Sequence, residues 1–262
     1  MPLTPFQRGV AQILARHRNP ESHVAGGAVI NRGEDGVRIS DDLDIFHDLA
    51  ASVAASAEAD AQALLAEGYS VAWTLRGEAI FKAVVTRGED HLRLDWTTDS
   101  AFRFFPVLPD EEFGYCLHQA DLATNKVLAL AGRSEVRDFL DILLIDRTYL
   151  SLGAVIWAAC GKDPGFTPTL LLDQTNRHSR YQESDLKGEH LARPVDLREL
   201  KQQWLAARAR AERLSEQLPA EELGCLYLDP GSKPVTPDPN SRDFPKLTRH
   251  FGSIRGAWPR IS

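Results

Sequence analysis

The stretch RISDDLDIF (residues 38–46) places three aspartates within four residues, interleaved with large apolar side chains. This alternation predicts a β-strand over residues 41–46, because successive side chains of a strand point to opposite faces. Asp42 and Asp44 then share one face, the apolar residues take the other, and Asp41 points away from the pair. Neighbouring carboxylates repel each other, so their face requires a compensating positive charge.

A divalent cation is the simplest source of that charge, since Mg²⁺ favours one or two carboxylate ligands and keeps positions free for substrate phosphates. Arg38 and Ser40 lie on the same alternating face if the strand begins early, and Asp95 is a further acid within the β-prone run HLRLDW. Upstream, Gly26 and Gly27 allow backbone amides to approach a phosphate without side-chain hindrance. For each acid taken alone, a solvated strand face remains an open alternative.

Hydrophobic periodicity predicts an α+β N-terminal half and a mainly helical C-terminal half, with a boundary near residues 109–118. The runs YSVAWTL, AIFKAVVT and HLRLDWTT, separated by RGE and RGED, predict a meander of three strands. Gly68 is expected to end one helix and Ser134 to cap another. Helices are expected at residues 4–17, 48–67, 118–131, 134–150 and 197–217.

Composition narrows the functional classes. A formal net charge of −7 gives no overall electrostatic footprint for nucleic acid, although a local basic patch remains open. No apolar run approaches the ~18 residues that span a membrane, and the N-terminal residues lack a signal-peptide pattern. The three cysteines fit neither a disulfide framework nor a zinc site, and Cys160 in WAACG is expected to be a core residue. We therefore expect a cytoplasmic protein with no membrane partner.

Lys126 lies within a predicted helix, and its neighbours at three and four residues are apolar. These neighbours are Leu122, Ala123, Ala129 and Leu130. Burying an ammonium in such a stripe is costly unless an anion compensates it. The alternative is a packed stem whose charged end reaches water.

The segment VRDFLDILLI is apolar on nearly all sides, which predicts a largely buried helix. Asp138 and Asp141 share a face of this helix, and Arg137 reaches Asp141 four residues further on. An internal Arg–Asp pair and an active-site role for one of the acids both remain open. On one straight helix Lys126 and Asp138 would lie ~18 Å apart along the axis, so they share a site only if Gly132 breaks the helix.

Together, GGAVI, RISDDLDIF and LRLDW resemble the nucleotidyltransferase superfamily related to DNA polymerase β, and within it the AbiEii/AbiGii toxin family. That family has a Gly-Gly or Gly-Ser element, an R-x-S-x-D-x-D pattern, a third strand acid, a helical lysine and an R-D-x-x-D helix. Ala28 departs from the pattern, because a hydroxyl residue is common there. The match covers about residues 22–145, and the matching positions are Gly26, Gly27, Arg38, Ser40, Asp42, Asp44, Asp95, Lys126, Arg137, Asp138 and Asp141.

The resemblance implies a nucleotidyltransferase core at residues 1–115, with a mixed sheet and helices on one side, followed by a mainly helical domain at residues 116–262. It implies an enzyme that transfers NMP from an NTP to tRNA or protein, as the toxin of a toxin–antitoxin or phage-defence pair with a cognate antitoxin. The resemblance implies that Asp42, Asp44 and Asp95 bind Mg²⁺ or Mn²⁺, with Asp95 alternatively acting as a base. It implies nucleotide binding by Gly26, Gly27, Arg38, Ser40 and Lys126. It also places Lys126 and Asp138 among the catalytic residues.

Two alternatives remain open. One is a small-molecule nucleotidyltransferase of the antibiotic-modifying kind, and the other is a non-catalytic nucleotide-binding module, which the intact acids argue against. A basic groove in the C-terminal half would favour tRNA as the acceptor, although an ordinary mixed-charge surface is the preferred interpretation. The candidate basic residues are Arg177, His178, Arg180, Arg208, Arg210 and Arg213.

Overall fold

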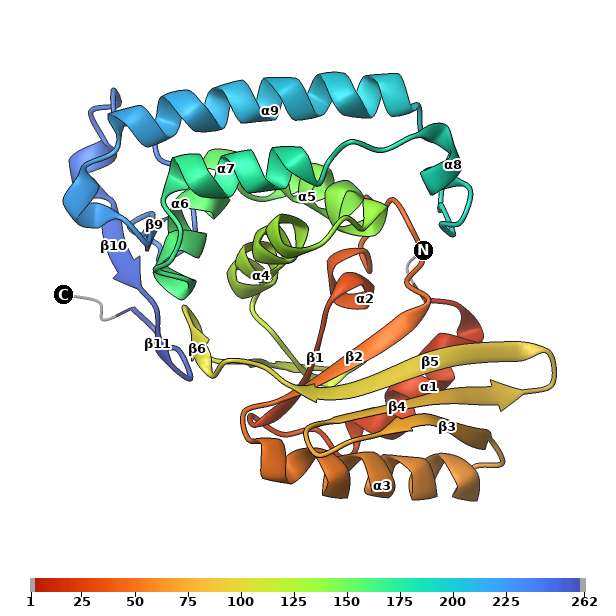
Figure 1. Ribbon diagram of the computed structural model, residues 1–262. Coiled ribbons are helices and arrows are strands. Elements are labelled where there is room, and N and C mark those ends of the chain that lie inside the picture. Colours follow the sequence, from red (N-terminus) through yellow and green to blue (C-terminus); the bar gives the residue numbers. More distant parts are fainter. Residues whose placement is uncertain (1–2, 260–262) are drawn as a thin grey trace. The chain divides into compact units, whose positions relative to one another are not determined.

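The computed structural model describes residues 3–259 (Figure 1). The chain divides into two compact units, each of which is described by itself. The first consists of Met1–Ala101 and Pro106–His118, and the second of Phe102–Phe105 and Gln119–Ser262. Within the described range, no helix combines the length and apolar character needed to cross a membrane.

A seven-stranded mixed sheet organises the first unit, in the order β3-β4-β5-β2-β1-β8-β7. The pairs β2–β5 and β1–β8 are parallel and the other neighbours are antiparallel. The expected meander is confirmed as β3, β4 and β5. The strands are β1 (Ser22–Ala25), β2 (Asp42–His47), β3 (Ser70–Arg76), β4 (Ile80–Arg87), β5 (Asp90–Thr98), β7 (Leu108–Asp110) and β8 (Gly114–Cys116).

Three helices accompany this sheet, and two of them bury one of its faces. The helices are α1 (Pro5–Ala15), α2 (Gly27–Ile30) and α3 (Ala50–Ala66). α1 begins with a reciprocal capping box between Thr4 and Gln7. α3 is followed by Gly68, whose φ of +81° ends the helix as the sequence predicts. α1 and α3 contact each other and the central strands. The side chains buried on this face include Leu43, Ile45, Val85, Leu94 and Trp96.

A buried polar cluster fixes α3 to the sheet. The Asp60 carboxylate is fully buried and accepts hydrogen bonds from Arg18 Nη2 at 2.5 Å and from the Trp96 indole at 2.7 Å. Nδ1 of His17 lies 2.9 Å from the same carboxylate. A buried carboxylate without such partners would cost several kcal/mol, so this cluster specifies how α3 is seated.

The second unit is mainly helical, as expected. The pattern at residues 197–217 is confirmed as α9, while three further helices in the middle of this half, α6, α7 and α8, were not predicted. The helices are α4 (Gln119–Gly132), α5 (Val136–Thr148), α6 (Leu152–Lys162), α7 (Pro168–Arg177), α8 (Glu183–Leu186) and α9 (Leu197–Gln217), with 3₁₀ turns at Ala220–Glu222 and Phe244–Lys246.

Two small antiparallel sheets complete the second unit. One pairs β9 (Cys225–Leu228) with β10 (Thr248–Phe251), and the other pairs β6 (Phe102–Arg103) with β11 (Ser253–Ile254). The Pro-rich segment between β9 and β10 is therefore an ordered excursion that returns to the sheet. One detail of the sequence analysis was wrong: the residue that caps α5 is Glu135, while Ser134 Oγ donates to the carbonyl oxygen of His178 at 3.4 Å.

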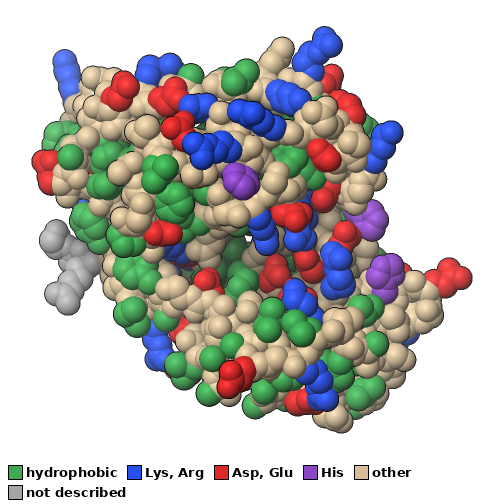
Figure 2. Space-filling view, in the orientation of Figure 1, with side chains coloured by type: hydrophobic (Ala, Val, Ile, Leu, Met, Phe, Trp, Pro, Cys, Tyr) green, Lys and Arg blue, Asp and Glu red, His purple; other side chains and the backbone are tan. Residues whose placement is uncertain are grey.

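Charged side chains of both signs are interspersed over the surface shown in Figure 2. Two of the candidate basic residues take part in ion pairs within the second unit. Arg208 binds Asp173 and Glu212, and Arg210 Nη2 lies 2.7 Å from Asp146. These contacts favour a mixed-charge surface here.

Candidate functional site

The acids predicted to share a face do so on β2 and β5. Along β2, partly exposed and buried residues alternate, with Asp42 and Asp44 on the partly exposed face. The parallel register places Asp44 opposite Asp95, which lies on the same face of β5. The structure therefore brings these three carboxylates onto one side of two adjacent strands, with the hydrophobic core beneath them.

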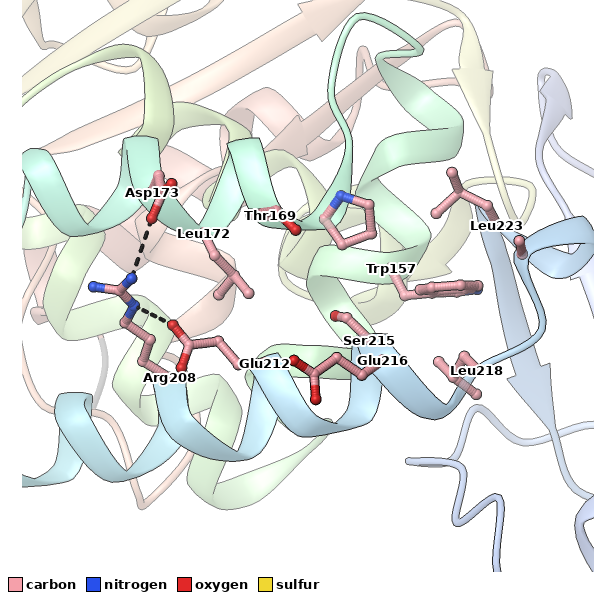
Figure 3. Close-up of a pocket in the computed structure, with 12 residues that line it drawn as sticks. Trp157, Thr169, Leu172, Asp173, Arg208, Glu212, Ser215, Glu216, Leu218 and Leu223 are labelled. Carbon is pink, nitrogen blue, oxygen red and sulfur yellow. Dashed lines mark hydrogen bonds and ion pairs between the residues drawn. The ribbon is translucent and has the colours of Figure 1, made fainter.

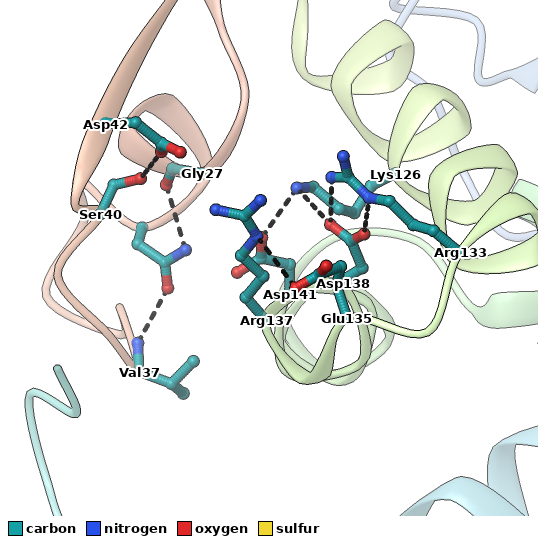
Figure 4. A network of polar contacts seen from close by, with 11 residues as sticks. Gly27, Val37, Ser40, Asp42, Lys126, Arg133, Glu135, Arg137, Asp138 and Asp141 are labelled. Atoms are coloured by element: carbon teal, nitrogen blue, oxygen red, sulfur yellow. Dashed lines mark hydrogen bonds and ion pairs between the residues drawn. The ribbon is translucent and has the colours of Figure 1, made fainter. Parts of the chain in front are cut away.

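Asp42 is oriented by residues that lie close to it. Ser40 Oγ donates to Asp42 Oδ1 at 2.9 Å (Figure 4), and Arg93 Nη2 lies 4.0 Å from Asp42 Oδ2. Ser40 is itself buried, and its carbonyl oxygen accepts a 2.7 Å hydrogen bond from the side chain of Gln7. The strand begins at Asp42, so Ser40 acts from the preceding loop.

Two glycines lie directly against the charged groups. Gly26 has a φ of +77°, and a Cβ there would fall 2.2 Å from Asp44 Oδ2. At Gly27, a Cβ would fall 2.0 Å from Nη2 of the buried Arg38 and 3.1 Å from Ser40 Oγ. The Gly-Gly pair is thus required for the backbone to approach these side chains closely.

Three residues that the sequence analysis did not select complete this cluster. Lys82 faces Asp95 across the β4–β5 register and its ammonium pairs with that carboxylate. Asn31 donates to the Gly27 carbonyl oxygen and accepts from the amide of Val37, each at 3.1 Å, so it holds the loop before β2. Arg93 is the third. The alternation of β4 and β5 could have indicated Lys82 and Arg93, but only once the strand register was known.

The carboxylates are the principal oxygen donors of this face. Among residues 3–259, no group of three or more His, Cys, Asp or Glu side chains is arranged to hold a metal ion by itself. Asp42 and Asp44 supply two carboxylates from a single strand. Mg²⁺ is usually bound by one or two carboxylates, while phosphate and water complete its coordination. The donor set therefore fits a magnesium ion that is shared with a phosphate ligand.

Lys126 and Asp138 belong to the second unit, where they contact each other. Lys126 Nζ lies 2.9 Å from Asp138 Oδ1 and 3.1 Å from Asp141 Oδ2, and both carboxylates are fully buried (Figure 4). α4 ends at Gly132 and α5 begins at Val136, so the expected helix break is present and brings the lysine to the acids. These two aspartates, which belong to the same unit, compensate the charge of the buried ammonium.

The ionisation of Asp138 follows from its two cationic neighbours. Burial alone would raise the pKa of Asp138, but the charge of Lys126 and hydrogen bonds from Arg133 and Lys126 outweigh it, so the pKa is lowered. Arg133 Nε lies 2.7 Å from Asp138 Oδ2, and its side chain is half exposed. The carboxylate is therefore charged at neutral pH.

The cysteines contribute no nucleophile. Cys116, Cys160 and Cys225 are all free and buried. Burial raises the pKa of each thiol to about 12, so the thiolate is scarce at neutral pH. The expectation that Cys160 packs in the core agrees with its burial.

No family model and no curated protein matches the sequence. Among solved structures, the chain is similar to MenT4, a nucleotidyltransferase toxin from Mycobacterium tuberculosis, with 16% sequence identity and a TM-score of 0.55. That match covers 82% of this chain and 83% of MenT4.

The chain has a nucleotidyltransferase fold. Two structures from Helicobacter pylori also match at 14% identity: JHP933, with a TM-score of 0.45, and a protein described as a nucleotidyltransferase, with a TM-score of 0.48. They cover 83% and 82% of this chain, respectively, and 96% of each other chain. The similarity to MenT4 confirms the nucleotidyltransferase-type fold expected from the sequence.

Proposed function

We propose that this protein is a metal-dependent nucleotidyltransferase that transfers NMP from an NTP to an acceptor hydroxyl. The observation that supports the proposal best is the set of carboxylates on the partly exposed face of β2 and β5, with Gly26 directly against Asp44. The fold agrees with this chemistry. A non-catalytic binding module would have no need for three acids on one face.

In the proposed site, Asp42 and Asp44 hold Mg²⁺ or Mn²⁺, and the bound metal supplies positive charge to the triphosphate. Ser40 orients Asp42 through its hydroxyl group, and Gly26 leaves room for Asp44. The nucleotide phosphates lie along the Gly26-Gly27 backbone, where amides can approach them closely.

The transfer step requires a proton acceptor, and we assign this role to Asp95. The ammonium of Lys82 already neutralises Asp95. The metal is therefore assigned to the two acids of β2, Asp42 and Asp44. The acceptor oxygen attacks the α-phosphorus. The bond between the α-phosphorus and the oxygen that bridges it to the β-phosphate breaks, and pyrophosphate leaves with the electron pair of that bond. Asp95 takes the acceptor's proton.

Arg38 and Lys126 are the proposed cationic contacts of the nucleotide, and Asp138 is the proposed acid that orients Lys126. Arg38 is buried against Gly27, close to the phosphate-binding backbone. The Lys126–Asp138 contact supports an orienting role within the second unit.

We further propose that the protein is a cytoplasmic toxin of the AbiEii/AbiGii kind, with tRNA or protein as acceptor and a cognate antitoxin as partner. The similarity to MenT4, which is a toxin, supports this proposal. So does the order of motifs from Gly26 to Asp141, which resembles that toxin family.

The decisive experiment incubates the protein with each α-labelled NTP, Mg²⁺, and either total tRNA or cell lysate. We expect label to enter one macromolecular fraction, and Asp44→Asn to abolish transfer. Asp41→Asn is the matched control, because Asp41 precedes the strand and is expected to point away from the site. Label found only in small molecules would favour the antibiotic-modifying alternative. Absence of transfer to every acceptor, together with no measurable NTP–Mg²⁺ binding, would overturn the proposal.

A further inference from the structure

A cavity of about 490 Å³ lies within the second unit, between α6, α7, α9 and the 3₁₀ turn at Ala220–Glu222. Figure 3 shows Arg208 with its two carboxylates at one end of this cavity and Trp157, Leu218 and Leu223 at the other. Its volume falls within the range of about 300–1,000 Å³ that is typical of small-molecule sites. None of its lining residues belongs to the carboxylate cluster of β2 and β5.

The apolar end of the cavity is rigid. Trp157 is only 3% exposed and packs with Leu218, Cys225 and Tyr227. Its indole nitrogen donates to the Glu222 carbonyl oxygen at 2.9 Å, which fixes the ring. The fixed ring and the aliphatic side chains beside it form an apolar surface for a ligand. Because these side chains are already ordered, they lose little conformational entropy when the ligand binds.

The charges of the lining favour a cation. The lining contains three acids and one base, and the base, Arg208, is already neutralised. Its Nη2 lies 3.1 Å from Asp173 Oδ1 and its Nε lies 2.9 Å from Glu212 Oε1. Glu216 is the third acid and is exposed to solvent at the cavity.

The end of α9 adds to this negative potential. α9 is a 21-residue helix that ends at Gln217, and its last turn contains no basic residue. The carbonyl end of a helix dipole attracts positive charge, and here the last turn carries Glu216 instead of a lysine or arginine. The Ser215 hydroxyl donates to the Ala211 carbonyl oxygen at 2.9 Å, so towards a ligand it can act only as an acceptor.

We propose that this cavity binds an amphipathic organic cation: a protonated amine carried on a small apolar or aromatic body. The apolar body packs against Trp157, Leu218 and Leu223, and the ammonium group lies at Glu216 beside the Ser215 oxygen. Aromatic rings and carboxylates both attract an ammonium group. The acids of the lining disfavour anionic ligands, including nucleotides. The proposal does not depend on the transfer chemistry of the first unit.

Phenethylamine is a suitable probe, and 2-phenylethanol is its neutral counterpart of the same shape. Binding of each to the full chain is measured by isothermal titration calorimetry at millimolar ligand concentrations. We expect saturable one-to-one binding of the amine, and binding of the alcohol about tenfold weaker, since a charge-assisted hydrogen bond is lost.

Glu216→Gln is the informative variant, because it removes one charge from an exposed position. Glu199→Gln is the matched control, because Glu199 is exposed in the first turn of the same helix. We expect Glu216→Gln to weaken amine binding about threefold, as for a solvent-exposed ion pair, and Glu199→Gln to leave it unchanged. Circular dichroism establishes that both variants are folded.

Three outcomes would overturn the proposal. The first is no saturable binding of phenethylamine to the wild-type chain. The second is a loss of selectivity: either the amine and the alcohol bind with equal affinity, or Glu216→Gln and Glu199→Gln change the affinity for the amine equally. The third is Glu216-dependent binding of a basic amphipathic peptide without binding of phenethylamine, which would identify the cavity as a site for a polypeptide.

Discussion

Asp44 and Asp95 occupy the same register position on the adjacent parallel strands β2 and β5, and both lie on the partly exposed face of the sheet. Lys82 extends this row on β4, where it faces Asp95 and pairs with it. The row therefore combines two acids with one cation that the protein itself provides.

Lys82→Met removes the ammonium that competes with a divalent cation for Asp95. We expect the variant to bind Mn²⁺ more tightly, as measured by electron paramagnetic resonance titration. The loss of unfolding free energy should be at most about 1 kcal/mol, because Lys82 is partly exposed. Lys201→Met, on the exposed surface of α9, is the control. Unchanged or weaker Mn²⁺ binding would contradict the assigned competition.

Gly26→Ala should disturb both backbone and site. A side chain at φ +77° is strained, and its Cβ would fall 2.2 Å from Asp44 Oδ2. We expect a loss of about 1–3 kcal/mol in the free energy of unfolding, together with loss of Mg²⁺–NTP binding. Gly33→Ala is the control, because nothing lies within 4 Å of a Cβ at that position. Similar effects of the two substitutions in urea unfolding and NTP titration would argue against the close approach of Gly26 to Asp44.

Lys126→Met should destabilise the second unit strongly. The change leaves the buried carboxylates of Asp138 and Asp141 without their ammonium, which typically costs about 3–5 kcal/mol. Arg133→Gln is the matched comparison, because Arg133 binds the same Asp138 from a half-exposed position and should matter less. Adding Asp141→Asn to Lys126→Met should restore part of the stability. Urea unfolding measures all four proteins, and an equal effect of the two single substitutions would refute the assignment.

Acidification should destabilise the protein in part through His47. Burial lowers the pKa of His47, and the nearby charge of Arg18 lowers it further. An unfolded histidine has a pKa of about 6.5, so between that value and the lower folded pKa the unfolded chain binds more protons. Stability contributed by neutral His47 is therefore present above about pH 6.5 and is lost as the pH falls towards the folded pKa.

The measurement for His47 is urea unfolding across this pH range. His47→Gln should reduce the dependence of the unfolding free energy on pH, whereas His91→Gln, on the exposed side of β5, should leave it unchanged. If the two variants have the same pH dependence as the wild type, His47 does not contribute to it.

The sequence predicted local features well where one short pattern determines the structure. The alternation around Asp42 and Asp44 was sufficient to assign their shared face, and Gly132 was sufficient to predict the break between α4 and α5. The contact of Asp44 with Gly26 and the pairing of Asp95 with Lys82 depend on strand register. Register is decided by contacts between segments far apart in the chain, which a local pattern does not contain.

The lack of a local amphipathic pattern explains why α6 was missed. α6 is apolar on nearly all sides, with Leu152 and every following residue to Cys160 buried, so it shows no amphipathic period. β9 and β10 pair across a long Pro-rich excursion, and no local signal predicts such a pairing.

The short segment Phe102–Phe105 belongs to the second unit, although the residues on either side of it belong to the first. Its amides at Phe104 and Phe105 donate to the buried Asp121, and the Phe104 carbonyl oxygen accepts from His250. A fragment that begins at Gln119 would therefore keep a buried carboxylate but lose the amides that satisfy it. A single cut between the two halves would therefore damage the helical half, and a fragment of the second unit has to include residues 102–105 as well as the residues that follow Gln119.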